Sequence, residues 1–228
     1  MSAIGSSEFK EAFMAALDRI HERYLIGLEG VKEVWLIRHG DAYTDVASLG
    51  ESSLDPPLSE VGRRQAALLG RRLAEARIRS LWSSDLGRAR ETATLASGSL
   101  PGVQIAVDPR LREVRTHWDA GLLPPAPKSR GEDEFPFLED ERRVVARMHE
   151  IVLAISRNLV RIDEPRAAAV SHAAAIGAYV AHLLGLPYGK LPILPQYTSV
   201  TVLRVLGERV VVESLADISH RIGEDVKD

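Results

Sequence analysis

The chain of 228 residues contains no cysteine, which excludes disulfide bonds, thiolate zinc sites and cysteine nucleophiles. It has no apolar run near the roughly 20 residues that a membrane-spanning helix requires, and residues 1–10 lack the apolar core of a signal peptide. Neither charge dominates, because 29 Lys and Arg stand against 32 Asp and Glu, for a net charge of −3. This balance disfavours a surface devoted to nucleic acid or anionic lipid. We therefore expect a cytoplasmic protein that binds neither nucleic acid nor membranes.

The remaining composition is that of an ordinary globular protein, with 45% apolar and 27% charged residues. The length corresponds to roughly 1.5 average domains, which predicts one domain with an accessory element. Arginine outnumbers lysine by 24 to 5. Positive charge at any site will therefore come mostly from planar guanidinium groups, whose paired donors suit phosphate and carboxylate.

Residues 7–29 have the pattern of an amphipathic helix that ends at Gly30. Apolar side chains recur there at intervals of three and four, namely Phe9, Phe13, Leu17, Ile20, Tyr24 and Leu28. We expect this helix to pack on the rest of the chain or on a partner subunit, and in the second case the protein is a homodimer. We accordingly divide the chain into a helical extension, residues 1–30, and a domain, residues 31–228.

From Val34 onward, short apolar runs that predict strands alternate with longer segments that predict helices. Such alternation predicts an α/β three-layer sandwich with a mainly parallel central sheet. Residues 114–138 are rich in proline and charge and are expected to form an irregular lid. The predicted strands are 34–37, 80–83, 103–107 and 167–170, the predicted helices are 59–77, 86–96, 141–159 and 173–184, and a hairpin spans 199–205 and 209–215.

Arginine and histidine follow three of the predicted strands. Arg38 and His39 come directly after the first strand. Arg88 comes soon after the second strand, and His172 soon after the fourth. The carboxyl ends of parallel strands share one edge of a sheet, where ligands bind. Two arginines and two histidines that converge there suit a phosphate dianion, since arginine offers forked donors and histidine offers a donor or a nucleophilic nitrogen.

An ordered series of motifs resembles the histidine phosphatase superfamily, the phosphoglycerate-mutase-like enzymes. The Arg-His-Gly tripeptide alone is common, but five blocks occur in the family's order between about Val34 and Leu215. The resemblance implies a phosphoglycerate-mutase-like fold for the histidine phosphatase domain, residues 31–228, and leaves residues 1–30 outside it. The blocks are Leu36–Gly40, Leu58–Gly62 with Gln65 and Ala66, Ser84–Ala89 with Glu91–Ala93, Leu111–Glu113 and Val170–His172.

The resemblance implies roles for five residues. His39 is implied as the nucleophile that takes the phosphoryl group, and Glu113 as the acid that protonates the leaving oxygen and then activates water. Arg38, Arg88 and His172 are implied to bind the phosphate oxygens. No metal and no cofactor are implied, because the arginines and histidines supply the charge. The implied activity is that of a metal-independent phosphomonoesterase, which hydrolyses a phosphorylated small molecule through a phosphohistidine.

The sequence departs from the family pattern at three places. Asp45 stands where the family often has asparagine, so that its carboxylate either turns away from the phosphate or contacts a substrate hydroxyl. Ala173–Ala175 stand where glycine commonly follows the second histidine. The segment after Arg38 lacks the Phe-Thr-Gly-Trp stretch of true cofactor-dependent phosphoglycerate mutases, and this absence favours hydrolysis.

Two alternatives stay open. The chain could be a phosphoglycerate mutase, which returns the phosphoryl group to the substrate, or a catalytically silent binding module of the same fold. Silent modules usually lose the nucleophile, an arginine or the acid, and all of these are present. His117 and Trp118 lie close to Glu113 in the chain, where they either contact substrate or anchor packing. By contrast, His149 and His220 are expected to be solvated.

Overall fold

The computed structural model describes residues 6–42, 55–115, 139–187 and 193–222. Within these ranges, six strands form one sheet in the order β3-β2-β4-β1-β5-β6. The first four strands in that order run parallel, and the last two are antiparallel at one edge. The predicted mainly parallel sheet is therefore confirmed. The strands are β1 (Lys32–Arg38), β2 (Ser80–Ser83), β3 (Ile105–Val107), β4 (Arg166–Ser171), β5 (Val200–Leu206) and β6 (Arg209–Asp217).

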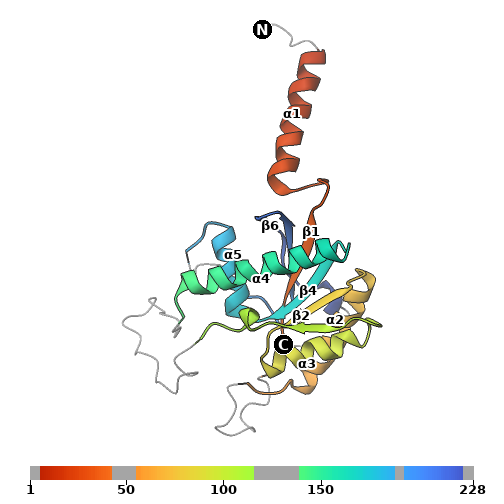
Figure 1. The fold of residues 1–228 in the computed structure, drawn as a ribbon, viewed down its shortest axis with the longest axis vertical. Coiled ribbons are helices and arrows are strands. Elements are labelled where there is room, and N and C mark those ends of the chain that lie inside the picture. The colour runs from red at the N-terminus through yellow and green to blue at the C-terminus, as the bar shows by residue number, and fades with distance from the viewer. Residues whose placement is uncertain (1–5, 43–54, 116–138, 188–192, 223–228) are drawn as a thin grey trace.

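Helices cover both faces of the sheet, which confirms the three-layer sandwich (Figure 1). One face carries α2 (Glu60–Glu75) and α3 (Gly87–Ser97), and the other carries α4 (Glu141–Arg161) and α5 (Ala173–Leu183). None of the helices in the described ranges is both long and apolar enough to cross a bilayer. The predicted boundaries of the strands and of these helices agree with the structure to within two residues.

The central strand β1 shows how one apolar run serves both layers. Val34 and Leu36 lie in the core beneath α4 and α5, while Trp35 and Ile37 lie in the core beneath α2 and α3. Successive side chains of a strand point to opposite faces, so a strand buried on both sides needs an unbroken apolar run. This requirement explains why Val34–Ile37 shows no polar alternation.

The N-terminal helix α1 (Ser6–Tyr24) ends five residues before the predicted end, so that prediction is wrong. Leu25 adopts a left-handed conformation with φ of 53° and buries its side chain. The amide of Ile26 then donates to the carbonyl of His21, which closes the last turn. Burial of a leucine side chain stabilises by about 1.5–3 kcal/mol, enough to offset the cost of the turn.

The apolar stripe of α1 remains exposed on this chain. Figure 1 shows the helix standing away from the sheet and its covering helices. Its carboxyl end is held, because Arg204 Nη1 and Arg209 Nη2 donate to the carbonyls of Tyr24 and Glu22, at 3.5 and 2.8 Å. The expected packing of the stripe on the rest of the chain is therefore wrong, and a partner subunit stays a prediction. The stripe residues Phe9, Phe13, Ile20 and Tyr24 are each 47–62% exposed.

Candidate active site

The carboxyl ends of β1 and β4 bring two histidines together. His39 follows β1 and His172 follows β4, and the amide of His39 donates to the carbonyl of Ser171, the last residue of β4, at 3.0 Å. The two imidazole rings lie with their centroids 5.1 Å apart. Neighbouring parallel strands thus place residues 133 positions apart in the chain side by side, as the sequence predicts.

The hydrogen bonds of His39 fix its tautomer. Its Nδ1 lies 2.7 Å from the carbonyl oxygen of Gly40, which can only accept, so Nδ1 carries the hydrogen. Its Nε2 lies 3.2 Å from Nε of Arg88, which can only donate, so Nε2 carries the lone pair. Both partners therefore require the same neutral imidazole.

The protonation state of His39 agrees with that tautomer. The side chain is 2% exposed, and burial lowers its pKa well below the usual 6.5. The guanidinium groups of Arg88 and Arg38 lower the pKa further, because a second positive charge beside them is unfavourable. The Nε2 atom is thus an unprotonated nitrogen held in a cationic environment.

Side chains from α2, α3 and the residue before α2 hold the loop after His39. The amide of Gly40 donates to Thr92 Oγ1 at 3.0 Å, and the amide of Asp41 donates to Gln65 Oε1 at 2.9 Å. Ser59 donates through Oγ to Asp41 Oδ2 at 2.6 Å and also caps α2. Motif residues on α2 and α3 therefore hold the loop that carries His39 in place.

Gly62 allows the closest approach in this region. A Cβ atom on Gly62 would lie 2.0 Å from the carbonyl oxygen of Asp41, a distance that real Cβ atoms do not reach. Gly40 is similarly close, since its Cβ would lie 2.7 Å from the carbonyl oxygen of Gly62. Two glycines thus let the first turn of α2 pack backbone to backbone against the loop 39–41.

Arg88 enters the site from the first turn of α3. Its side chain is 5% exposed, and its Nη1 forms an ion pair with Asp55 Oδ1 at 2.9 Å. The Asp55 carboxylate also accepts from the amides of Gly87 and Arg88, at the amino end of α3. Asp55 therefore anchors both the helix end and its arginine, and we did not single it out from the sequence.

Arg38 is held against an aromatic ring. Its guanidinium carbon lies 3.8 Å from the ring centroid of Tyr197, and its Nη1 donates to the carbonyl of Pro195 at 2.9 Å. The Tyr197 ring also lies 5.9 Å from the ring of His39, measured between centroids. Tyr197 thus borders both residues, although no strand pattern or motif in the sequence pointed to it.

His172 is fully buried beside these groups. Its Nε2 lies 3.0 Å from Ser84 Oγ, and its Nδ1 has no hydrogen-bond partner among the described residues. Burial lowers the pKa of His172 well below 6.5, and the nearby rings and guanidiniums of His39 and Arg88 add to the effect. The second histidine is therefore also neutral in the absence of an anion.

Glu113 follows the 3₁₀ turn η3 (Pro109–Leu111) in the chain and lies against the amino end of α5. Its carboxylate accepts from the amides of Val114 and Ala175, both at 2.9 Å, and from Ala174 at 3.3 Å. Burial raises the pKa of Glu113, whereas these three amides and the charge of Arg88 lower it. The net effect raises the pKa of Glu113, whose carboxyl group is held at the first turn of α5, directly after His172.

All five predicted site residues therefore meet at the carboxyl edge of the sheet. Arg88 donates to His39, the His39 ring lies beside that of His172, and the ring of Tyr197 borders both His39 and Arg38. The carboxyl group of Glu113 binds the first turn of α5, which follows His172 directly. Such a set can bind a phosphate dianion, present an unprotonated nitrogen to phosphorus and supply a proton to a leaving oxygen.

Comparison with known proteins agrees with this site. Residues 34–218 match the sequence profile of the histidine phosphatase superfamily (branch 1). The chain belongs to the histidine phosphatase superfamily. The matched span includes the whole sheet, from β1 to β6, apart from the first two residues of β1.

Relatives in the superfamily carry names of two kinds. The probable phosphoglycerate mutase GpmB of Cronobacter sakazakii is 30% identical over 213 residues, which cover 82% of this chain and 94% of that protein. A mycobacterial glucosyl-3-phosphoglycerate phosphatase of known structure is 27% identical, with a TM-score of 0.62 over 81% of this chain and 98% of that one. A phosphoglycerate mutase from Bacillus anthracis shares the fold, with a TM-score of 0.65 at 23% identity over 83% of this chain and 95% of that one.

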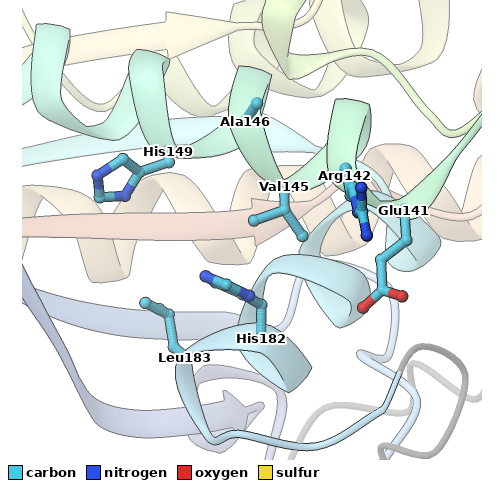
Figure 2. Close-up of a pocket in the computed structure, with 7 residues that line it drawn as sticks. All are labelled: Glu141, Arg142, Val145, Ala146, His149, His182 and Leu183. Carbon is cyan, nitrogen blue, oxygen red and sulfur yellow. The ribbon is translucent and has the colours of Figure 1, made fainter.

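A separate cavity of about 520 Å³ lies between α4 and α5 in this histidine phosphatase superfamily member (Figure 2). Nδ1 of His149 forms a hydrogen bond with Tyr179 Oη at 2.9 Å. His182 lies at the carboxyl end of α5, whereas Glu113 binds the amino end of that helix. None of the five predicted site residues lines this cavity. Among the described residues, no three His, Asp or Glu side chains gather closely enough to hold a metal ion. The cavity is lined by Glu141, Arg142, Val145, Ala146, His149, His182 and Leu183.

The remaining residues that the sequence singled out are either outside the described ranges or more buried than expected. Asp45, His117 and Trp118 lie outside the described residues, as does most of the expected lid. The prediction that His220 is solvated is wrong, since it is half-buried and its Nδ1 lies 3.2 Å from Nη1 of Arg72. Burial, followed by the charges of Arg72 and Arg221, lowers the pKa of His220 to about 4. His149 is also half-buried rather than solvated.

Proposed function

We propose that the protein is a phosphomonoesterase that hydrolyses a phosphorylated small molecule through a phosphohistidine on His39. The observation that carries this proposal is the fixed, neutral tautomer of His39, with its Nε2 lone pair directed at Arg88 in a cationic environment. A structural histidine needs no such lone pair beside a buried guanidinium. A nucleophile that attacks phosphorus needs it.

Binding of the substrate phosphate is assigned to Arg38, Arg88 and His172. In the structure, Nε of Arg88 donates a hydrogen bond to the lone pair on Nε2 of His39. Attack therefore requires this donor to move from Nε2 to a phosphate oxygen, which at the same time exposes the lone pair. The arriving dianion also offers an acceptor to Nδ1 of His172, which has no partner in the described part of the chain.

The first chemical step forms a bond between Nε2 of His39 and phosphorus and breaks the bond from phosphorus to the leaving oxygen. Glu113 gives its proton to that oxygen, so the alcohol leaves neutral. The charge of the transferring group spreads over its equatorial oxygens, where Arg38 and Arg88 stabilise it. No metal ion or organic cofactor is needed for this step.

The second step returns the protein to its starting state. The carboxylate of Glu113 takes a proton from water, whose oxygen attacks phosphorus, and the bond to Nε2 breaks. The products are inorganic phosphate and neutral His39. The same carboxyl group thus acts first as acid and then as base, which its raised pKa favours.

Hydrolysis is favoured over phosphoglycerate mutase activity by the missing Phe-Thr-Gly-Trp stretch after Arg38. The mutase remains the second candidate, because relatives such as the Cronobacter sakazakii protein are named probable phosphoglycerate mutases. A catalytically silent module is disfavoured, since the nucleophile, both arginines, the second histidine and the acid are all present and close together.

A rapid-quench experiment tests the proposal. The protein is mixed with an excess of a phosphate ester, quenched within milliseconds and analysed for acid-labile phosphate on histidine. We expect phosphohistidine on the wild type and on the exposed control His182→Ala, and none on His39→Ala. Steady-state release of phosphate should vanish only in His39→Ala, and full activity in that variant would refute the nucleophile.

The same preparation separates the two candidate activities. The panel of substrates includes 3-phosphoglycerate and glucosyl-3-phosphoglycerate, because relatives are named for them. We expect net release of inorganic phosphate that does not depend on added bisphosphoglycerate. Isomerisation of 3-phosphoglycerate that requires bisphosphoglycerate, without net phosphate release, would establish the mutase instead.

A further inference from the structure

Arg147 of α4 binds the backbone that carries Glu113. Its Nη1 donates to the carbonyls of Arg110 and Arg112, at 2.8 and 2.7 Å, and its Nη2 donates to the carbonyl of Glu113 at 3.3 Å. Three carbonyls within four residues therefore accept from one guanidinium. Arg110 and Leu111 belong to the 3₁₀ turn η3, whereas Arg112 and Glu113 lie in no helix or strand, so secondary structure does not fix the end that carries the carboxyl group.

The remaining donors of Arg147 bind Glu139. Nε donates to Oε1 at 2.8 Å and Nη2 to Oε2 at 2.9 Å, in a parallel two-bond pair. Both side chains are mostly buried, at 16% and 14% exposure. A guanidinium has five N–H groups, and five hydrogen bonds leave Arg147, so its donor capacity is fully used.

The fourth carbonyl of the segment is also held. Ser171 Oγ donates to the carbonyl of Leu111 at 2.7 Å, at the end of β4 and directly before His172. Every carbonyl from Arg110 to Glu113 thus accepts from a side chain of α4 or β4. The carboxylate of Glu113 is meanwhile held by amides of α5, including Ala174 and Ala175.

We propose that Arg147 is a positioning residue for the proton transfer, which sets the place of the Glu113 carboxyl group relative to the leaving oxygen. The inference rests on the proposed function, since only a Glu113 that donates a proton needs such placement. Arg147 touches neither the phosphate nor the reacting atoms. Arg147 acts by holding the backbone of the segment that carries Glu113.

Lysine cannot replace this arginine. An ammonium group has three donors and no planar fork, so it cannot bind Glu139 through two parallel bonds and three carbonyls together. In Arg147→Lys the positive charge stays, while the 110–113 backbone loses part of its support. Proton transfer responds steeply to distance, and misplacement by about 1 Å can cost about 10²-fold in rate.

The test compares two leaving groups in single-turnover phosphorylation of His39. An alkyl phosphate needs a proton on its leaving oxygen, whereas p-nitrophenol leaves readily as its anion. We expect Arg147→Lys to slow the alkyl phosphate at least tenfold more than p-nitrophenyl phosphate. The exposed control Arg143→Lys, four residues away on α4, should change neither rate by more than about twofold.

A double-variant cycle with Glu113→Gln separates positioning from a general structural effect. If Arg147 acts through the Glu113 carboxyl group, then Arg147→Lys will lose its leaving-group selectivity in the Glu113→Gln background. Equal slowing of both substrates in the single variant, or unchanged selectivity in the double variant, would overturn the inference. The rate constant of the burst reports only molecules that react. Partial unfolding therefore lowers the burst amplitude and leaves the ratio of the two rate constants unchanged.

Failure of the inference and failure of the proposed function give different results. A wild type that forms no phosphohistidine overturns the proposed function, and the inference with it. A wild type that forms phosphohistidine, with unselective Arg147 variants, overturns the inference alone. If Arg147→Lys does not fold, Glu139→Gln serves in its place, because it weakens the two-bond pair at its other end. Glu139→Gln should also slow the alkyl phosphate more than p-nitrophenyl phosphate, by a smaller factor.

Discussion

Gly62→Ala should impair catalysis strongly while the protein stays folded. A Cβ at this position would lie 2.0 Å from the carbonyl oxygen of Asp41, while contacts below 3.0 Å do not occur. The backbone must therefore shift by at least about 1 Å. Neither side can yield alone, because Ser59 binds Asp41 through both its amide and its hydroxyl.

The shift passes directly to His39, the proposed nucleophile, since Asp41 lies two residues after it. Overpacking of this kind costs about 1–3 kcal/mol of stability, or several degrees in Tm for a protein of this size. A misplacement of about 1 Å at a reacting group can cost about 10²-fold in rate. We therefore expect kcat/KM for p-nitrophenyl phosphate to fall about 100-fold while the protein still unfolds cooperatively.

The matched control is Gly98→Ala at the end of α3. Gly98 already has helical backbone angles, φ −56° and ψ −23°, and its Cβ would meet only the carbonyl oxygen of Leu95, at 3.2 Å. We expect its kcat/KM within threefold of the wild type and an almost unchanged Tm. Activity of Gly62→Ala within threefold of the wild type, measured per folded molecule, would show that the close approach does not position His39.

Three further variants test the site and its surroundings. Arg88→Ala should lower kcat/KM at least about 100-fold, because it removes charge-assisted bonds worth about 1.5–3 kcal/mol each, and a loss under threefold would place Arg88 outside phosphate binding. Glu113→Gln should slow the single-turnover phosphorylation by an alkyl phosphate by about 10²–10⁴-fold and by p-nitrophenyl phosphate much less, whereas equal losses would assign Glu113 to structure. His220 has a pKa of about 4 in the folded state and about 6.5 unfolded, so below pH 6.5 the unfolded state takes up a proton that the folded state refuses. Urea unfolding should therefore show the wild type losing more stability than His220→Gln between pH 7 and pH 5, and parallel losses would contradict the buried state of His220.

Local patterns in the chain were enough to predict the layers and to name the five candidate site residues. The pattern of the apolar residues predicted each strand and α-helix from Val34 onward to within two residues, because burial on one or two faces imposes a local pattern. The two short 3₁₀ turns were not predicted. The position of Arg38, His39 and His172 directly after strands predicted their convergence, because parallel strands end at a common edge. Both arguments need only neighbours in the chain and the rules of sheet geometry.

How the site residues are held follows from packing between distant parts of the chain. Tyr197 stacks on Arg38 from 159 positions away, and Arg147 reaches Glu113 from 34 positions away. Neither contact produces a repeat or a motif in the sequence. The same is true of His220, which lies in the tail but is half-buried against Arg72. Long-range contacts depend on how the elements pack, and packing selects individual side chains without leaving a local pattern.

The N-terminal helix also shows what a local repeat cannot predict. Its apolar repeat predicted a helix correctly but placed its end at 29, because a repeat records which residues share a face and not what the face contacts. The helix ends at Tyr24, where Leu25 turns to a left-handed conformation and buries its side chain, and the stripe stays exposed. Local periodicity therefore determines that an element forms, while the surfaces available to each side chain in the folded chain determine where it stops.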